Sequence, residues 1–483
     1  MPTIPVTTAL RDYVTMAFGI DVRALAMFRI ALGLTSLGYV VSLTVDYRLL
    51  LTGDGVAPAR LIWPAEAIHF IGPEAFYAFA DSPAATLTVL MILATAASLL
   101  VVGAWSRVAA FVLWLGVNYL LRRNPWLTNA QHSMVLFSLL WAMFLPIGAR
   151  WSVDAALRGV GRRTPLQVVS PATAGLLVQI FFLYLTAGLA KSGPEWHAEA
   201  SAIETITHLE RYQMFTTPLL QMLPSPVLAV VTRGVWWLEV VAPLLLFWPV
   251  FFTPARIAAG LGLIGLHLGL GAFMRLGVFP WICVTFLLVT LPGPFWDRLV
   301  PGSGFGGSEA AQPPKRSALR MFGHAVAALL LVCTLTSYMR LVPGLEGNNP
   351  AWMRELGGIL RLGHVYRLFS SVGRTTSRLL VVGTFDSGKR LDLLSRGEVV
   401  MHWNASRLSI APDDSDTFPW VYYSVTATGK KVRTSELGNG YAGWLCDAYR
   451  DANLRHVEIH RFVRAVPIGS SGVASRTIYE TDC

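Results

Sequence analysis

The residues best suited to chemistry lie where an apolar run ends, in the sequence FFLYLTAGLAKSGPEWH at residues 181–197. Lys191 stands where the apolar run stops, and a Gly-Pro break then leads to Glu195, Trp196 and His197. A lysine at this depth either extends its ammonium to the membrane interface or lies in a polar cavity inside the protein. A desolvated lysine can act as a general base. Lys191 is therefore either a membrane-interface anchor or a catalytic base.

Three more ionisable side chains fall within or at the head of apolar runs: His132, Glu239 and His267. If successive runs cross a membrane in alternating directions, all three share the outer half of the protein with Lys191. Ionisable groups that lie together are the usual components of acid–base sites. The alternative is that the histidines and Glu239 each make an interhelical hydrogen bond without a role in chemistry.

The composition is that of a polytopic membrane protein. Of the 483 residues 54% are hydrophobic and 14% are charged, and the mean hydropathy is +0.51, whereas about 25% of residues are charged in soluble domains. The net charge of +10 therefore indicates contact with anionic lipid rather than with nucleic acid. The four cysteines form no C-x-x-C or Cys/His cluster, so no metal is expected. A disulfide between Cys446 and Cys483 is compatible with an extracytoplasmic C-terminal region, and the sequence does not decide whether it forms.

The apolar runs predict an all-α polytopic membrane bundle of about nine spans, followed by a small C-terminal α+β domain outside the membrane. Arg29 lies about two turns into the first span, where it either faces the bundle interior or reaches the interface. The spans are expected at residues 23–45, 84–105, 108–121, 132–148, 172–190, 227–252, 257–274, 278–296 and 321–339.

An odd number of spans places the two termini on opposite sides of the membrane. Lys and Arg are more frequent on the segments that share a side with the N-terminus, which predicts a cytoplasmic N-terminus. We divide the chain into a transmembrane domain (1–297), a linker with the last span (298–340), and an extracytoplasmic domain, periplasmic or lumenal (341–483). In the last part we expect helices at 353–369 and 441–453, and strands at 379–385, 390–394, 399–403 and 421–426, with a hairpin turn at 386–389.

Several short motifs stand in the order and spacing of a known family of membrane enzymes. They are FR at 28–29, NAQHS at 129–133, WSVD at 151–154, AGLAK at 187–191 with the following Glu195-Trp196, and His267. With these motifs the chain resembles the vitamin K-dependent gamma-glutamyl carboxylases, within the wider HTTM (horizontally transferred transmembrane) group. The resemblance runs from about Phe28 to Trp296, which is more than half of the chain.

The resemblance implies a mechanism that uses a reduced vitamin K-type quinone with O2 and CO2 as co-substrates. Lys191 would deprotonate the hydroquinone, which reacts with O2 to give an epoxide and a strong base. That base would remove a γ proton from a substrate glutamate, and CO2 would trap the carbanion. His132 would assist as a second catalytic residue, and Arg29, Trp196, Glu239 and His267 would bind quinone or substrate.

The chain also departs from the family pattern. The lysine pair that the family carries is Ala190-Lys191 here, and Gly193-Pro194-Glu195 replaces the usual residues beside it. The region 341–483 is much shorter than the lumenal portion with which eukaryotic carboxylases bind a substrate propeptide. The partners we expect are the lipid bilayer and a quinone, and the sequence does not decide whether a protein or peptide is also a substrate.

Two functions of different classes fit these residues. The first is the membrane enzyme described above. The second is a non-catalytic HTTM membrane protein that binds lipid or quinone, or assembles with partners, in which Lys191 is an interfacial anchor. A transporter fits less well, because no repeated, broken spans stand in corresponding halves of the chain.

Overall fold

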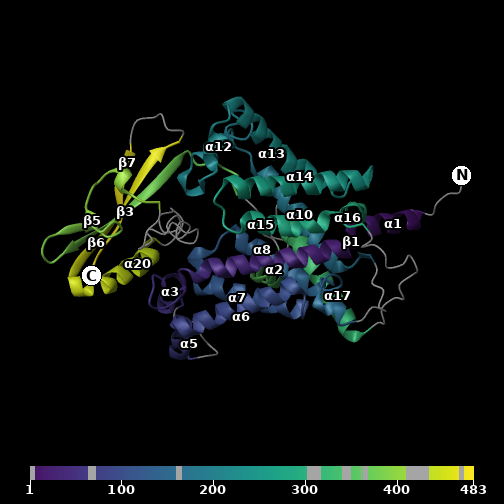
Figure 1. Ribbon diagram of the computed structural model, residues 1–483, viewed down its shortest axis with the longest axis horizontal. Coiled ribbons are helices and arrows are strands. Elements are labelled where there is room, and N and C mark those ends of the chain that lie inside the picture. The colour runs from purple at the N-terminus through teal and green to yellow at the C-terminus, as the bar shows by residue number, and fades with distance from the viewer. Residues whose placement is uncertain are drawn as a thin grey trace.

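The computed structural model describes residues 6–63, 72–158, 166–301, 317–339, 350–360, 362, 368–408, 434–466 and 473–483. Its helices form one bundle, and a five-stranded sheet stands at one end of that bundle (Figure 1). The first helix, α1 (Val6–Phe18), lies at the opposite end. The expected architecture of a helical membrane bundle with a small C-terminal α+β domain is confirmed.

Within the described part of the chain, six helices are long and apolar enough to cross a membrane. Their lengths of 20 to 23 residues match the hydrocarbon thickness of a bilayer. They correspond to six of the expected spans: α2 (Val22–Thr44), α6 (Pro83–Val102), α10 (Pro171–Ala190), α13 (Ser225–Leu245), α14 (Phe252–Phe273) and α17 (Ala318–Met339).

The other three expected spans show that nine is an approximate number. α7 (Ser106–Arg123) is helical but carries arginine at both ends, and α8 (Ala130–Phe144) has only 15 residues. The eighth expected span is broken into α15 (Phe279–Leu287), the 3-10 turn η4 (Leu288–Thr290) and α16 (Gly293–Leu299), with a bend of 106°. Pro292 stands at the break, and a proline forces the residue before it out of the helical conformation.

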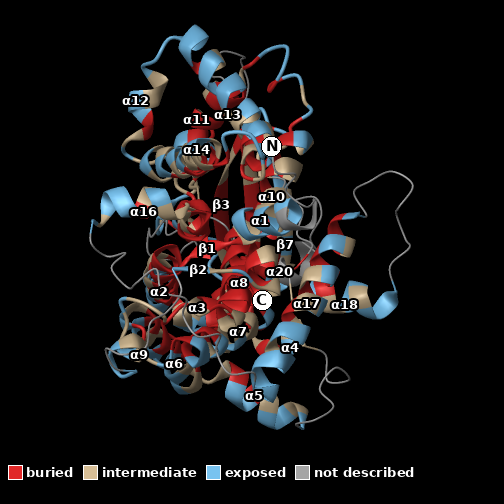
Figure 2. Ribbon diagram, turned by 90° about the vertical axis from the view of Figure 1, so that its right-hand side faces the viewer, coloured by how far each residue is buried: buried red, intermediate tan, exposed pale blue. Residues whose placement is uncertain are grey.

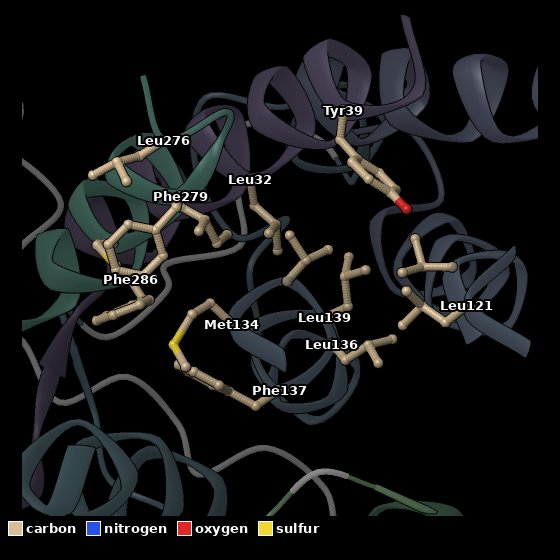
Figure 3. Close-up of a cluster of buried hydrophobic side chains, with 14 of the residues drawn as sticks. Leu32, Tyr39, Leu121, Met134, Leu136, Phe137, Leu139, Leu276, Phe279 and Phe286 are labelled. Carbon is tan, nitrogen blue, oxygen red and sulfur yellow. The ribbon is translucent and has the colours of Figure 1, made fainter. Parts of the chain in front are cut away.

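α8 forms the centre of the bundle. Residues 131–142 are buried without interruption, which explains why so short an apolar helix is stable here (Figure 2). Met134, Leu136, Phe137 and Leu139 pack among side chains of the surrounding helices (Figure 3). These neighbours include Leu32 and Tyr39 of α2, Leu121 of α7, and Phe279 and Phe286 of α15.

Buried arginines fasten helix ends. Arg123 donates to the carbonyl oxygens of Ala57 and Ala80, at 2.5 and 2.8 Å, and pairs with Asp81 at 2.8 Å. Arg256 donates to the carbonyls of Thr290 and Ala17, at 2.8 and 3.0 Å. The last carbonyls of a helix have no partner within it, so these guanidinium groups satisfy carbonyls where one segment meets another.

A two-stranded sheet sets the direction of the two helices that matter most for the site. β1 (Ile20–Asp21) pairs antiparallel with β2 (Gln167–Val168), directly before α2 and close before α10. Both helices therefore begin at the same end of the bundle. At 1.5 Å per residue, the 20 residues of α10 carry Lys191 roughly 30 Å away, to the end where the C-terminal sheet stands.

The C-terminal domain is built on an antiparallel sheet with the order β5-β4-β3-β6-β7. The strands are β3 (Thr375–Phe385), β4 (Arg390–Asp392), β5 (Gly397–Glu398), β6 (Leu454–Ala465) and β7 (Val473–Asp482). The helices are α18 (Ala351–Ile359) and α20 (Thr434–Ala448). The expected strands at 379–385 and 390–394 and the hairpin between them are confirmed, with Gly388 at φ +76° in the turn.

Other expectations for this domain were wrong or lie outside the described residues. The segment 399–403 is not a strand, because β5 ends before it and a 3-10 turn (Trp403–Ala405) follows. β6 and β7 were not predicted at all. The expected strand at 421–426, residues 302–316 of the linker, and parts of the helix at 353–369 lie outside the described residues.

A disulfide joins Cys446 of α20 to Cys483, which follows β7. The pairing that the sequence left open is therefore present in the structure. It closes a segment of 37 residues and links α20 to the edge strand of the sheet.

Candidate functional site

Lys191 caps the C-terminus of α10 and turns its ammonium into the protein. Its backbone leaves the helical conformation at ψ 70°, and its N–H donates to the carbonyl of Gly188 at 3.2 Å. The side chain is only 3% exposed, and Nζ lies 3.5 Å from the carbonyl oxygen of Ala187. Because lipid would also meet an exposed side chain, this burial places the ammonium between protein segments rather than at the interface.

The partner of Lys191 is Glu239 of α13. Lys191 Nζ donates a hydrogen bond to Glu239 Oε2, and both side chains are buried, at 3% and 8% exposure. A buried charge is tolerated only when it is paired, because leaving water costs several kcal/mol per ion. Lys191 and Glu239, for which the sequence predicts a similar depth in the membrane, are therefore in direct contact.

A glycine makes this contact possible. A Cβ at Gly188 would lie 2.7 Å from Val240 Cγ2 and 3.2 Å from the backbone carbon of Glu239, so α10 and α13 approach each other closely here. The carbonyl of Gly188 also accepts from Trp236 Nε1 at 3.2 Å. The short interhelical distance brings the Lys191 ammonium within reach of the Glu239 carboxylate.

Gly188→Ala should lower the free energy of unfolding by about 1–3 kcal/mol, because the added methyl forces the two helices apart. The thermal unfolding of purified protein measures this effect. Gly265→Ala is the matched control, since a Cβ at Gly265 of α14 meets nothing within 4 Å, and alanine there is neutral or stabilising by up to about 1 kcal/mol. Equal behaviour of the two variants would contradict the close approach at Gly188.

The residues that follow Lys191 fold back over it. The Trp196 ring lies 5.1 Å from Lys191 Nζ and is 1% exposed, and its Nε1 donates to the carbonyl of Phe369 at 2.8 Å. His197 Nε2 donates to the Lys191 carbonyl at 2.7 Å, and its ring packs edge-on against Trp236. Trp196 thus offers the ammonium a cation–π contact and separates it from water.

A second pair of residues extends the site into the bundle. The Tyr184 hydroxyl lies 2.7 Å from His267 Nε2, and both residues are buried. His267 Nδ1 is buried without a hydrogen-bond partner among the described residues. Electrostatic interactions connect His267 with Lys191, and Tyr184 with Glu239. The Tyr184–His267 pair therefore lies near the Lys191–Glu239 pair, and a role of His267 in binding stays a prediction.

Tyr184 was missed in the sequence, although a signal for it exists. It precedes Lys191 by seven residues, which is two helical turns and places both on the same face of α10. A tyrosine two turns below a functional lysine faces the same interior, and its hydroxyl needs a polar partner there. His267 is that partner.

His132 stands at the N-terminus of α8 and forms part of its cap. Its Nδ1 accepts the backbone N–H of Asn129 at 3.0 Å, while Asn129 Oδ1 accepts from the N–H of Gln131 at 3.1 Å. The His132 ring packs edge-on against Tyr39 of α2, with 5.2 Å between centroids. Because Nδ1 accepts, Nε2 carries the proton of the neutral ring.

Arg29 lies at the other end of the bundle from Lys191. Its Nη2 donates to the carbonyl of Trp151 at 2.5 Å, and its guanidinium packs against Gly103. The FR and WSVD motifs thus meet each other, near the starts of α2 and α7, and Arg29 does not reach the Lys191 cluster.

Asp154, the last residue of the WSVD motif, caps α7. Its carboxylate accepts from the N–H groups of Trp105 and Ser106, at 2.8 and 3.0 Å, and from the Ser106 hydroxyl at 2.7 Å. Burial acts to raise the pKa of Asp154, but these hydrogen bonds hold it below its usual value. The motif therefore joins the α6–α7 turn to the α8–α9 connection, where α9 is Val153–Ala156.

The C-terminal domain is fastened to the connection that covers Lys191. Glu195 Oε1 accepts the N–H of Val372 at 3.1 Å, and Trp196 bonds to Phe369 as described above. Ion pairs join Glu210 to Arg378 at 2.6 Å and to Arg464 at 3.1 Å. A movement of the sheet would therefore displace Trp196, whose ring lies against the Lys191 ammonium.

Comparison with known proteins gave one match. The family model described as HTTM domain matches residues 19–293, more than half of the 483 residues, and this range contains the Lys191 cluster, His132 and Arg29. No curated protein and no solved structure matched the chain.

Proposed function

The chain belongs to the HTTM domain family, and on that premise we propose that it is an integral-membrane enzyme whose base is Lys191. The substrate of that base is a reduced naphthoquinone of the vitamin K type, oxidised with O2 to its epoxide. The observation that carries the proposal is the Lys191–Glu239 pair, buried beside Trp196 near the end of a membrane bundle.

The residues at the site suit a reduced quinone. A hydroquinone has two hydroxyl groups on a flat apolar ring, and it requires nitrogen or oxygen partners beside aromatic side chains. Lys191 Nζ offers a polar contact, and so does His267 Nδ1, which has no hydrogen-bond partner among the residues that the structure describes. Trp196 and Phe279 offer aromatic surface. When bound, the quinone would supply, through its reaction with O2, a base strong enough to remove a proton from carbon.

The ion pair explains how Lys191 can act as a base. A lysine accepts a proton only as a neutral amine, whereas the pair holds it as an ammonium. Transfer of one proton from Nζ to Glu239 Oε2 leaves an amine and a carboxylic acid, and a dry site favours such a neutral pair over separated charges. Glu239 thus holds the proton while the amine receives one from the substrate.

The neighbouring residues position and shield this reaction. A hydrogen bond joins Tyr184 and His267 and fixes the His267 ring, and no described residue bonds to Nδ1, so this nitrogen can contact a ligand. Trp196, held by the Phe369 carbonyl, keeps water from the amine. Water exclusion matters because a carbanion formed at the site is otherwise reprotonated. We propose that the same reaction is coupled to the carboxylation of a substrate glutamate with CO2.

The test uses purified protein in detergent with a reduced naphthoquinone and O2. Quinone epoxide is measured by chromatography, with oxygen-free and quinone-free samples as controls. Epoxide that requires both reactants supports the proposal, and incorporation of labelled CO2 into added glutamate peptides then tests the coupled step. A folded, monodisperse sample that forms no epoxide would contradict the enzyme assignment for this class of quinone.

One observation favours the alternative, a non-catalytic HTTM protein that binds lipid or quinone. The Lys191 ammonium is already paired in the structure, and a buried ion pair can simply hold two helices together. Quinone that co-purifies with the protein and is never turned over would identify this second function.

We further propose that the N-terminus is cytoplasmic and that the C-terminal domain and the Lys191 end face the extracytoplasmic side. The charge bias supports this orientation, and so does the Cys446–Cys483 disulfide, because disulfides persist in oxidising compartments. Alkaline phosphatase fused after Cys483 should therefore be active in bacterial cells. An inactive fusion after Cys483, together with an active phosphatase fused after Val300, would show that the protein has the opposite orientation in the membrane.

A further inference from the structure

The Lys191 site is closed in the structure. The side chains of Lys191 and Glu239 are 3% and 8% exposed, and Trp196, which lies against the ammonium, is 1% exposed. The proposed function, on which this inference rests, requires a hydroquinone hydroxyl at hydrogen-bond distance from Lys191 Nζ. A flat ring system cannot reach a buried amine from outside, so at least one wall of the site must move before the substrate binds.

The two spans that carry the ion pair form firm walls. α10 and α13 approach so closely that a Cβ at Gly188 would lie 2.7 Å from Val240 Cγ2, and Trp236 Nε1 donates across this contact to the Gly188 carbonyl at 3.2 Å. Separation of the two helices would break the close packing between both spans. The wall that Trp196 forms is held by fewer contacts.

Trp196 belongs to a short turn, residues 195–199, between α10 and the next helix. The N–H of Glu199 donates to the carbonyl of Pro194 at 2.9 Å, which closes the turn. Ala200 follows with φ +52°, a left-handed conformation that strains any residue with a Cβ. The turn can therefore swing as one body, and rotation at Ala200 relieves strain.

A strap from the C-terminal domain, residues 369–374, holds this turn from the other side. Trp196 Nε1 donates to the Phe369 carbonyl at 2.8 Å, and the N–H of Val372 donates to Glu195 Oε1 at 3.1 Å. Phe369 has a left-handed backbone too, at φ +57°. Backbone strain therefore lies on both sides of this contact, and such strain is typical of clamps and switches.

An ion pair completes the contact between the strap and the turn. Arg374 pairs with Glu199, and the two side chains are 58% and 40% exposed. Exposed ion pairs and single hydrogen bonds each contribute little net stability. The closed position is therefore only slightly favoured, and we expect an open state as a minor population. Because Arg374 directly precedes β3, a movement of the sheet acts on the strap.

We propose that the turn 195–199 and the strap 369–374 form a cover, which opens to admit substrate to Lys191. Opening breaks the Trp196–Phe369 hydrogen bond and swings the turn about Ala200, while α10 and α13 stay together. Substrate then enters from the end of the bundle where the C-terminal sheet stands (Figure 1). The C-terminal domain thus controls whether substrate reaches the base.

The experiment measures access to Lys191 and does not require activity. The full chain in detergent is treated with acetic anhydride, which acetylates accessible neutral amines. Peptide mass spectrometry compares the acetylation of Lys191 with that of Lys389, which is exposed. Backbone hydrogen exchange of residues 192–201 is measured in parallel, because it does not depend on the basicity of the Lys191 amine.

Three variants carry the test. Glu195→Ala/Arg374→Ala removes two of the contacts between the strap and the turn. The matched control, Asp447→Ala/Arg450→Ala, removes an exposed ion pair elsewhere in the C-terminal domain. Ala200→Gly relieves the strain of the closed turn without changing any charge, so it should act in the opposite direction.

Lys191 in Glu195→Ala/Arg374→Ala should be acetylated about five- to thirtyfold faster than in wild type, with faster exchange of residues 192–201, given the lost hydrogen bond and ion pair. Ala200→Gly should slow both by about fivefold, and the control should match wild type. Unchanged access in Glu195→Ala/Arg374→Ala, or faster exchange in α13 instead of the turn, would overturn the cover.

This result is separate from that of the epoxide assay. Access that follows the cover in protein that forms no epoxide would support the cover and contradict the enzyme function. Epoxide formation by wild type, with unchanged access in Glu195→Ala/Arg374→Ala, would overturn the cover alone. If that variant loses its fold, Ala200→Gly decides, since access equal to or faster than that of wild type would overturn the proposal.

Discussion

Lys191→Ala should lower the oxygen-dependent oxidation of a reduced naphthoquinone by about a hundred- to ten-thousandfold, which is the usual contribution of a general base. The amine is the nitrogen that Glu239 and Trp196 hold in a dry position. Neither side chain can replace the amine as a base. The Trp196 indole has no basic nitrogen, and the buried Glu239 carboxyl takes up a proton once Lys191 is gone. Epoxide formation by purified protein measures the effect.

The fold should survive this substitution. Once Lys191 is gone, Glu239 becomes neutral by protonation and leaves no uncompensated charge in the bundle. Lys389→Ala is the matched control, since it removes an exposed lysine from the β3–β4 hairpin. Full epoxide formation by a folded Lys191→Ala protein would remove Lys191 from the mechanism and favour the binding function.

The bundle could be predicted from the sequence because apolar length is a strong signal. Five of the six helices long enough to be spans begin and end within five residues of the expected runs, and α13 ends seven residues before its run does. Each run must match the thickness of a bilayer. The same signal failed at 278–296. Composition alone does not reveal a bend of 106°, although Pro292 and Pro294 were visible there.

The strands β6 and β7 could not be found in this way. β6 places His456, Glu458 and His460 on one face and Val457 and Ile459 on the other. This is the alternation of a half-buried strand, but polar residues at every second position lower the mean hydropathy of the segment and weaken its apolar signal. β7 is exposed along most of its length and carries almost none of that signal.

The candidate site was partly predictable, for a physical reason. Charge inside a span is costly, so Lys191 and Glu239 stood out against apolar neighbours and could be expected to share one part of the protein, although their direct pairing was not predicted. Tyr184 is uncharged and did not stand out. The FR and WSVD motifs were visible, but their place at the opposite end of the bundle follows from β1 and β2, which begin α2 and α10 together.

Glu239→Gln should lower the free energy of unfolding by about 3–5 kcal/mol, because the buried Lys191 loses its counterion and must either stay charged without a partner or give up its proton. The amide keeps the shape of the carboxylate, so the loss reports charge rather than packing. Thermal unfolding of purified protein measures it. A melting temperature equal to that of wild type would show that the ammonium is not buried as the structure places it.

A double variant separates the structural role of the pair from its chemical role. Lys191→Met/Glu239→Leu removes both charges, and apolar replacement of a buried ion pair is often neutral or stabilising. We therefore expect it to recover most of the stability that Glu239→Gln loses, while epoxide formation stays absent in both. If activity followed stability across wild type, Glu239→Gln and the double variant, the pair would serve only to hold α10 against α13. If stability returns without activity, the protein keeps a costly buried charge for the chemistry of Lys191.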